Sequence, residues 1–366
     1  MSDRHSEAGA EFSTGLRHGV AIAAGILVAI TGAQLWRWCH LPLPWLVGSL
    51  YAVALARVAG LLLLAPPGAR QLGQWVVGIN MGLYFTSAVA SEVASHAFLI
   101  FGMAFASLLA GFVGAAALVR WRLADGPTAF FASMPGGASE MASLSDQWMG
   151  SADRVAAAHA IRVMLVVLIV PLALTMTDTH GTDLAPVVAR EILWQRLVLM
   201  AAASLAGVGA FTLLRLPNAW LLGTLFAGAS LGIGGAPLSG LPDWLGATGQ
   251  LLIGVSLGCR FGPSFLHKAP AFLAGIAILS LGFLASTAML ALLLTHLTHL
   301  TFPNLLLSFA PGGIAEMSLT ATHLHLAVPL VVAAHVVRLA ILTLLAPAAF
   351  RIFSGWRRSD DRPHHS

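Results

Sequence analysis

The chain has 366 residues, of which 58% are hydrophobic and 9% are charged, with 19 Lys and Arg against 15 Asp and Glu. Soluble proteins carry about 25% charged residues, so this composition excludes a soluble enzyme, a nucleic-acid-binding protein and a disordered regulator. The hydrophobic residues occur in long runs. The small positive surplus is therefore interpreted as an orientation signal in the loops of a polytopic membrane protein.

The N-terminal residues 1–18 are polar and contain Asp3, Glu7 and Glu11, which is not typical of a cleaved signal peptide. We expect a cytoplasmic tail at 1–18 and a basic cytoplasmic tail at 351–366. Both termini would then lie on the cytoplasmic side of a bacterial inner membrane, which the chain crosses several times.

Ten segments are apolar and near the length of about 20 residues that a helix needs to cross the bilayer. They are expected at 19–36, 43–65, 71–91, 97–119, 155–177, 192–214, 217–235, 244–262, 269–295 and 328–350. The runs lack the alternation of a membrane barrel. The expected fold is therefore all-α.

The sequence repeats itself with a shift of 176 residues. The shift relates Gln74 to Gln250, Gly78 to Gly254, Pro127 to Pro303, Pro135-Gly136-Gly137 to Pro311-Gly312-Gly313, Glu140-Met141 to Glu316-Met317, His159 to His335, and Arg162 to Arg338. A register held across almost a hundred residues indicates an internal duplication. We predict membrane repeat 1 at 19–177, a connector at 178–191 and membrane repeat 2 at 192–350.

Two further apolar segments, at 127–149 and 303–325, are each interrupted by Pro-Gly-Gly. The two arms of the first segment, at about 12 and 18 Å, each reach roughly the middle of a 30 Å core. If the interrupted segments cross, the repeats are parallel, and if they re-enter, the repeats are inverted. Crossing leaves five cations outside and re-entry leaves three. The positive-inside rule thus favours two inverted repeats of about five transmembrane helices each, plus a broken re-entrant or discontinuous helix.

The element Pro-Gly-Gly-x-x-Glu-Met occurs at 135–141 and at 311–317. It would open a half-helix whose free N–H groups form an anion site, and paired half-helices build the substrate sites of many transporters. A packing turn is the alternative, which the second copy disfavours. The expected substrate-binding residues are Pro135, Gly136, Gly137, Ser139, Glu140 and Arg162 in repeat 1, and Pro311, Gly312, Gly313, Glu316 and Arg338 in repeat 2.

Proton or ion coupling is assigned to Glu140, Glu316, His159 and His335. Each carboxylate lies in the first turn of a half-helix, where it either offsets the helix dipole or carries a proton or cation. Each histidine either shuttles protons or simply hydrogen-bonds a helix.

Arg162 and Arg338 are too deep in their expected spans to reach the membrane surface easily. Each arginine either forms an ion pair with the glutamate of its own repeat or contacts the substrate directly. The two Pro-Gly-Gly turns are expected to approach each other near the midplane.

The motifs resemble the AbrB family of bacterial inner-membrane proteins, which is unrelated to the DNA-binding transition regulators of that name. The resemblance is carried by Ala132-Ser-Met-Pro-Gly-Gly-Ala-Ser-Glu-Met141 with His159-Ala-Ile-Arg162, and by Ala310-Pro-Gly-Gly-Ile-Ala-Glu-Met317 with His335-Val-Val-Arg338. It covers about residues 19–350. It implies an internally duplicated transporter, although some relatives are labelled ammonia monooxygenase or regulator of gene expression.

The main functional hypothesis is a secondary transporter for a small organic solute, with an anion expected, bound between the repeats. The alternatives are a membrane-bound regulatory or scaffold protein and a membrane metal-dependent monooxygenase. Cys39 and Cys259 are interpreted as packing residues, and the sequence shows no catalytic motif, metal cluster or cofactor fingerprint. We therefore expect no enzyme activity, no metal and no cofactor. The expected partners are the lipid bilayer, the solute and a coupling proton or cation, without nucleic acid; small-residue runs such as 102–114 would permit a homo-oligomer.

Inverted repeats place Arg154 and Lys268 on the same, cytoplasmic side of the membrane. Single cysteines at these two positions should therefore react with a membrane-impermeant maleimide only from the cytoplasm. Labelling of either position from outside would remove the basis for two re-entrant segments.

Overall fold

The computed structural model describes residues 2–177, 191–236, 238–263 and 269–360, with side chains described between Arg17 and Gly355. All elements within these ranges are helices and none is a strand, which confirms the predicted all-α fold for this part of the chain. The predicted connector at 178–191, except Glu191, lies outside the described residues, and so do Lys268 and residues 361–366 of the predicted basic tail.

Six helices are long and apolar enough to cross a membrane, which is consistent with a polytopic membrane protein. They are Arg17–Trp38 within α1 (Ser2–Trp38), α5 (Ala97–Arg120), α8 (Ala152–Met176), α9 (Trp194–Leu213), α12 (Pro270–Thr295), and Val328–Gly355 within α15 (Val328–Asp360). They correspond to six of the ten expected spans.

The other four expected spans contain shorter or bent helices. Three of them contain η1 (Pro44–Gly48) joined to α2 (Ser49–Val58), α10 (Ala219–Ile233) and α11 (Asp243–Gly258). The fourth contains α3 (Ala69–Gly82) and α4 (Ser87–Ser95), and the chain bends by 92° between these two helices. Fifteen helical residues rise about 22 Å, which is short of a 30 Å core. Gly60 (φ +96°) and Gly235 (φ +74°) follow α2 and α10 in a left-handed conformation, which ends both helices there.

The chain forms two compact units that do not follow the repeat boundaries. Unit 1 consists of Met1–Val77 and Leu241–Lys268, and unit 2 consists of Gly78–Gly240 and Ala269–Ser366. The last residues of α3 therefore belong to unit 2. Each unit combines segments that are distant in the sequence.

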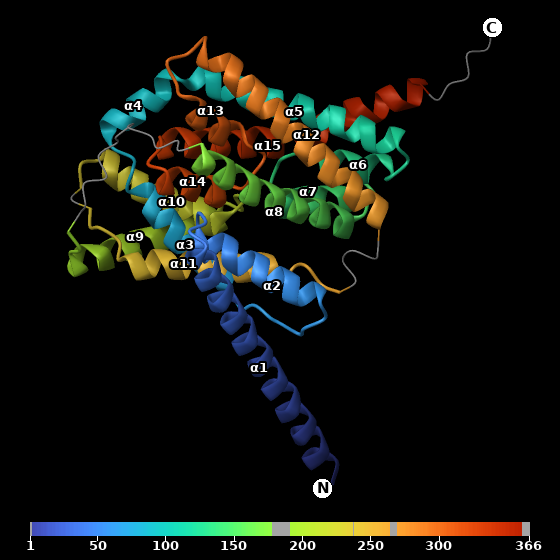
Figure 1. The fold of residues 1–366 in the computed structure, drawn as a ribbon, viewed down its shortest axis with the longest axis vertical. Coiled ribbons are helices and arrows are strands. Elements are labelled where there is room, and N and C mark those ends of the chain that lie inside the picture. The colour runs from blue at the N-terminus through green and yellow to red at the C-terminus, as the bar shows by residue number, and fades with distance from the viewer. Residues whose placement is uncertain (1, 178–190, 237, 264–268, 361–366) are drawn as a thin grey trace. The chain divides into compact units, whose positions relative to one another are not determined.

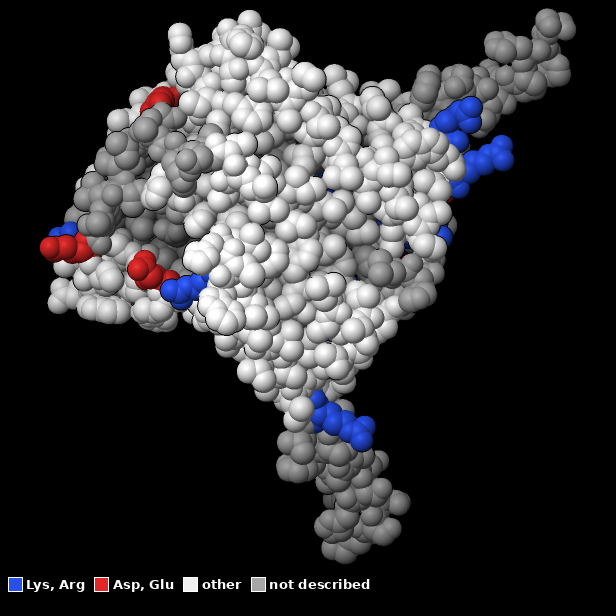
Figure 2. Space-filling model, viewed as in Figure 1, with Lys and Arg blue, Asp and Glu red and all other residues white. Residues whose placement is uncertain are grey.

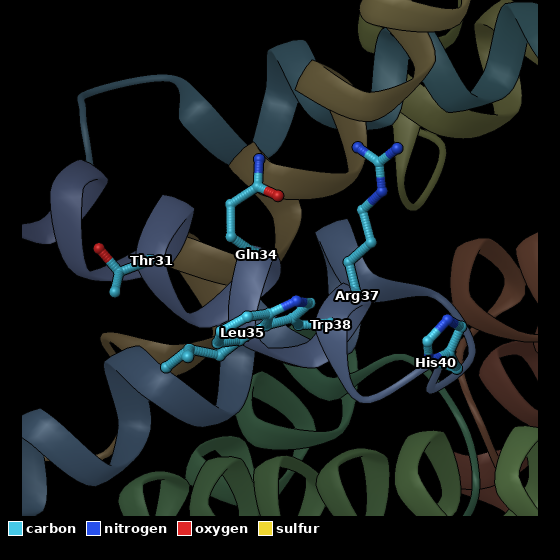
Figure 3. Close-up of a pocket in the computed structure, with 6 residues that line it drawn as sticks. All are labelled: Thr31, Gln34, Leu35, Arg37, Trp38 and His40. Carbon is cyan, nitrogen blue, oxygen red and sulfur yellow. The ribbon is translucent and has the colours of Figure 1, made fainter.

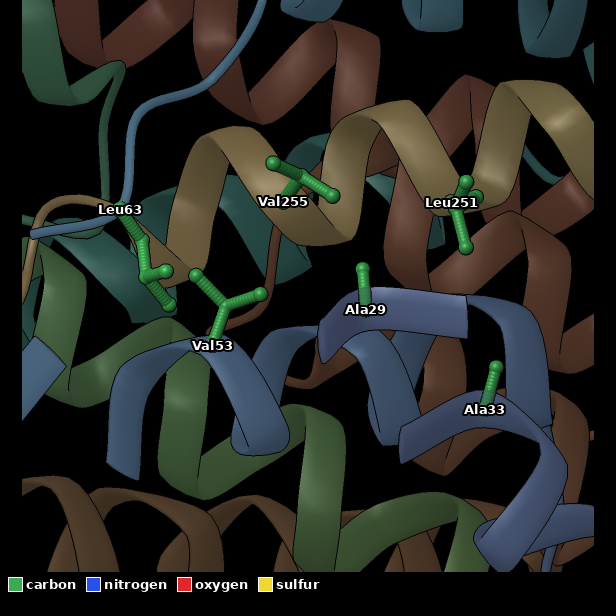
Figure 4. Close-up of a cluster of buried hydrophobic side chains, with 6 residues drawn as sticks. All are labelled: Ala29, Ala33, Val53, Leu63, Leu251 and Val255. Carbon is green, nitrogen blue, oxygen red and sulfur yellow. The ribbon is translucent and has the colours of Figure 1, made fainter. Parts of the chain in front are cut away.

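Unit 1 is built from α1, η1, α2, the first part of α3, and α11, and α2 packs against α11 (Figure 1). Its buried core is shown in Figure 4 and consists of Ala29, Ala33, Val53, Leu63, Leu251 and Val255. Small residues let the backbones approach closely. A Cβ added to Gly32 of α1 would lie only 2.6 Å from the carbonyl oxygen of Gly48.

Unit 2 contains α4, α5, α8–α10, α12, α15 and four short helices: α6 (Gly126–Ser133), α7 (Ala138–Gln147), α13 (Phe302–Phe309) and α14 (Ile314–His323). Within it, α15 packs against α5 and α8 packs against α12. One buried cluster joins α5, α13 and α15, and its members are Ile100, Met103, Phe309, Leu330 and Ala334. Each of the four short helices therefore packs against at least one long apolar helix.

The surface agrees with a lipid environment. Nearly all the visible surface of the described residues in Figure 2 is uncharged. Large apolar side chains on α5 and α12 are exposed, among them Phe98, Val113 and Ile278. Many exposed large apolar side chains on a surface with few charges are typical of a surface that contacts another apolar phase.

The contact between α9 and α10 supplies a test of this packing. A Cβ on Gly207 would collide with the carbonyl oxygen of Gly223, whereas a Cβ on Gly209, on the same helix, meets nothing within 4 Å. Gly207→Ala should destabilise the protein by about 1–3 kcal/mol. Gly209→Ala should be neutral or stabilising by up to about 1 kcal/mol.

Thermal unfolding in detergent micelles measures both variants against the unmodified protein. Equal melting temperatures for the two variants would contradict the close approach of α9 and α10.

Candidate functional site: two interrupted helices held by arginine

The two Pro-Gly-Gly motifs interrupt helices as predicted. In the first, α6 ends at Ser133 and α7 begins at Ala138, and in the second, α13 ends at Phe309 and α14 begins at Ile314. Eight and ten helical residues rise about 12 and 15 Å, so no single arm crosses a membrane. Each interruption exposes the C-terminal carbonyls of one helix and the N-terminal N–H groups of the next.

Arg162 of α8 binds the carbonyl end of α6. Its guanidinium donates to the backbone oxygens of Met134 (3.0 Å), Ala132 (2.5 Å) and Ser133 (3.2 Å). The side chain is buried. A planar, permanently charged donor fork suits a helix C-terminus, where unpaired carbonyls carry partial negative charge.

Arg338 of α15 makes the corresponding bonds in the second motif. It donates to the backbone oxygens of Ala310 (2.6 Å) and Gly312 (2.7 Å) and is also buried. At both interruptions, the carbonyl end of the first helix is therefore bound by a guanidinium from the long helix that follows.

The two glutamates lie at the other side of each interruption. The Glu140 side chain folds back over Gly137, so that its Oε2 occupies the space a Cβ would need, and Glu316 does the same over Gly313. A carboxylate in this place offsets the positive end of α7 or α14. A side chain at the second glycine of each motif would displace this carboxylate from the helix end.

The described residues show arginine bonded to backbone carbonyls, where pairing with the glutamate of the same repeat was one of the two expectations. Arg162 and Arg338 donate to backbone carbonyls, while Glu140 and Glu316 cover glycines at helix N-termini. The physical reason is that each interruption offers two partial charges of opposite sign. Arginine is neutralised by one and glutamate by the other.

The two histidines are buried and bonded differently. The ring nitrogens of His159 lie 2.9 Å from the Val155 oxygen and 3.0 Å from the Met134 oxygen. In His335, Nε2 lies 2.9 Å from the Leu307 oxygen, and Nη2 of Arg338 donates to Nδ1 at 3.0 Å.

Within unit 2 the structure brings the two motifs together. α7 packs against α15 and α14 packs against α8. A Cβ on Gly137 would lie 3.3 Å from Leu339 of α15, and the charge of Arg162 acts on Arg338. The expected site residues of both motifs therefore share one region.

The two arms differ in their accessibility. In α14, residues 314–321 are all buried, including Glu316. In α7 only Met141 and Ser145 are buried, while Ser139 is exposed and Glu140 is partly exposed. One motif is thus enclosed and the other is open on one side.

Two positioning residues were missed by the sequence analysis. Thr128 Oγ1 accepts the N–H of Ser151 (2.8 Å), and Asn304 Oδ1 accepts the N–H of Ala327 (3.0 Å). Each bond ties the first arm to the loop that enters the arginine-bearing helix. Both residues follow the prolines at 127 and 303, so the repeat register contained a signal for them.

Three buried hydroxyl groups on the arms have no hydrogen-bond partner. They are those of Ser133, Ser145 and Ser318. Buried polar groups are nearly always satisfied, by protein or by an ordered small molecule such as water. Ser133 ends α6 at the first interruption, whereas Ser145 and Ser318 lie further along α7 and α14.

A surface hollow in unit 1 is unrelated to the motifs. It is shown in Figure 3 and is lined by Thr31, Gln34, Leu35, Arg37, Trp38 and His40. It contains none of the expected site residues. Among the described residues, no group of three or more His, Cys, Asp or Glu side chains is placed to hold a metal.

Comparison with known proteins gives a family match over most of the chain. The model of the AbrB family, described as "Transition state regulatory protein AbrB", matches residues 45–354. "Uncharacterized protein YhjN" of Bacillus subtilis (strain 168) is 27% identical over 91% of this chain and 91% of its own length. "Putative regulator AbrB" of Escherichia coli (strain K12) is 28% identical over 86% of this chain and 91% of its own length. No solved structure matches.

The bonds of Arg162 predict that Glu140 is not its electrostatic partner. Arg162→Met removes the donors to three carbonyls and should destabilise the protein by at least about 3 kcal/mol. Adding Glu140→Gln should not restore stability, whereas Arg162→Lys should restore part of it because an ammonium keeps donors without the fork.

Unfolding in detergent with increasing denaturant compares the four proteins. Full recovery of stability in the Arg162→Met, Glu140→Gln double variant would show that these two charges neutralise each other after all.

Proposed function

This chain belongs to the AbrB family, and we propose that it is a secondary transporter for a small organic solute, with an anion as the expected substrate. The observation that carries the proposal is the pair of interrupted helices in unit 2, whose ends are held by buried Arg162 and Arg338. Interrupted backbone at membrane depth is tolerated only where protein buries it or where it lines a polar cavity. Transporters use this arrangement for their substrate sites.

The bounds of the helices support an internal duplication. The bounds of α6 and α7 become those of α13 and α14 when 176 is added to each. Unusual backbone positions also recur. Positive φ angles pair His40 with Arg215, Leu43 with Asn218 and Met149 with His325, with shifts of 175 or 176.

Reciprocal packing supports a two-fold relation between the repeats. In unit 2, Gly78 of α3 lies against Leu221 and Thr224 of α10. In unit 1, Gly254 of α11 lies against Leu46 and Ser49, which are the residues equivalent to Leu221 and Thr224. Such an exchange of partners is typical of a two-fold axis. The distribution of cations favours our proposal that this axis lies in the membrane plane, so that the repeats are inverted and both termini are cytoplasmic.

The chemistry of the interruptions favours an anion. The first N–H groups of α7 and α14 have no partner within their helices, and two guanidinium groups lie in the same region. The carboxylates of Glu140 and Glu316 now lie at those helix ends and would compete with an anionic solute. Binding of the solute would therefore favour protonation, or pairing with a cation, at these carboxylates, which is why we propose them as coupling sites.

A regulatory role is the alternative suggested by the name of the Escherichia coli relative. A regulator or scaffold would tolerate neutral replacements of Glu140 and Glu316, because such a protein would not need an ionisable group at the interruptions. A transporter that couples at these carboxylates would not tolerate the same replacements. A metal-dependent monooxygenase would require bound metal, which metal analysis of the purified protein measures.

Uptake into proteoliposomes tests the transporter directly. The panel consists of radiolabelled mono-, di- and tricarboxylates and phosphate esters, with neutral sugars and amines as controls for charge. We expect one class of anion to accumulate. Glu140→Gln should reduce that uptake at least tenfold, and Gly209→Ala should leave it unchanged because its Cβ meets nothing within 4 Å.

Correct folding of each variant is checked by its melting temperature before uptake is measured. Absence of uptake for every solute by well-folded protein would reject the transporter. If cells that carry Glu140→Gln and Glu316→Gln then behave like cells with the unmodified protein and unlike cells without it, the regulatory alternative is favoured.

A further inference from the structure

His159 has both ring nitrogens directed at carbonyl oxygens. Nδ1 faces the Val155 oxygen one turn earlier in α8, and Nε2 faces the Met134 oxygen at the end of α6. A carbonyl oxygen only accepts hydrogen bonds, and a neutral imidazole has one N–H and one lone pair. With a single proton, one lone pair would oppose a carbonyl oxygen at about 3 Å. With two protons, both contacts become hydrogen bonds.

His335 has the opposite requirement, although its sequence context is equivalent. Arg338 donates to its Nδ1, and its Nε2 faces the Leu307 oxygen. One donor and one acceptor match a neutral imidazole that carries its proton on Nε2. A second proton would lie on Nδ1, directly against a guanidinium.

The charges near His159 act in both directions. The titratable or charged groups on α8 and on the helices packed against it are Asp153, Arg154 and Arg162 on α8, Asp125 at the start of α6, Glu140 and Asp146 on α7, and Glu316 and His323 on α14. α12, which also packs against α8, contributes none. Arg162 shares the Met134 oxygen and opposes a second cation, whereas the carboxylates favour one. The two carbonyl acceptors add to the groups that favour a second proton.

We propose that His159 is a proton-binding site, that the second proton it takes up is a coupling ion of transport, and that His335 stays neutral. A neutral His159 ring bonds one of the two carbonyl oxygens, in α8 or at the end of α6 according to its tautomer. Only the doubly protonated ring bonds both and so joins α8 to the interruption after α6. Proton binding is thereby linked to the geometry of the interruption. The coupling part of this proposal depends on the proposed function, whereas the proton site does not.

The positive charge of a protonated His159 sets the direction of coupling. A protonated His159 adds positive charge to an interior that already holds buried Arg162, Arg338 and Glu316. An anionic solute at the interruptions would offset this charge, so proton and anion strengthen each other's binding, and linkage makes the effect reciprocal. The expected mode is symport of proton and anion.

Nuclear magnetic resonance of the unmodified protein in lipid nanodiscs tests the proton site. The dipeptide Ala-His occurs only at 158–159 and 334–335 among the 14 histidines, and His-Val occurs only at 335–336. Alanine labelled at the carbonyl carbon, with histidine labelled in carbon and nitrogen, therefore selects these two rings. Additional labelling of valine nitrogen identifies His335.

We expect His159 to give two protonated ring nitrogens near neutral pH, and His335 to give one protonated and one bare nitrogen. A bare ring nitrogen on His159 from neutral to mildly acidic pH would overturn the proposal. A doubly protonated His335 would overturn its second part.

Transport separates the coupling role from the proton site. With the solute found in the uptake panel, His159→Gln should lose accumulation driven by a proton gradient but keep solute exchange at equal pH. His96→Gln, between α4 and α5, is the matched control for loss of a histidine. Gradient-driven accumulation by His159→Gln equal to that of the unmodified protein would reject the coupling role. Absence of any transported solute would reject the proposed function and leave the resonance result as the test of the proton site.

Discussion

The donation of hydrogen bonds from a buried guanidinium to the carbonyl end of an interrupted helix is the constraint on which unit 2 depends. Proline and glycine end α6 and α13 inside an apolar structure, and each end leaves carbonyl groups that no neighbouring backbone can satisfy. Arg162 and Arg338 satisfy them from α8 and α15. The long helices must therefore lie where their arginines reach the interruptions, which fixes the packing of the arms.

The glutamates complete this electrostatic arrangement from the other side. Each interruption has a negative helix end bound to arginine and a positive helix end covered by a carboxylate. Four buried or partly buried charges thus lie in one region, each beside a helix end of opposite partial charge. Under the proposed function, a proton or a solute would compete with the carboxylates at these helix ends. The open α7 and the enclosed α14 give the two copies of this arrangement different access to water.

Much of this arrangement could be predicted from the sequence, and the exceptions have physical causes. Pro135 and Pro311 located both interruptions, since no ordinary helix continues through Pro-Gly-Gly. The carbonyl bonds of Arg162 and Arg338 were not foreseen, because buried charge predicts that a partner exists but not that backbone carbonyls supply it. The shortness of α10 and α11 was missed because hydropathy counts apolar residues without regard to where the backbone turns. The difference between His159 and His335 was not predictable, since it depends on which atoms of α6 and α13 face two equivalent rings.

The close fit of Glu140 over Gly137 has a consequence for how such a sequence can change over time. The carboxylate and a Cβ at position 137 would occupy the same volume, so a side chain at 137 requires the carboxylate to move. A chain that acquires alanine at 137 while keeping the acid must move the acid off the helix end, and a chain that loses the acid no longer needs the glycine. The two positions are therefore expected to vary as one inherited unit, and the same holds for Gly313 and Glu316. Aligned descendants of this chain should show either both residues or neither.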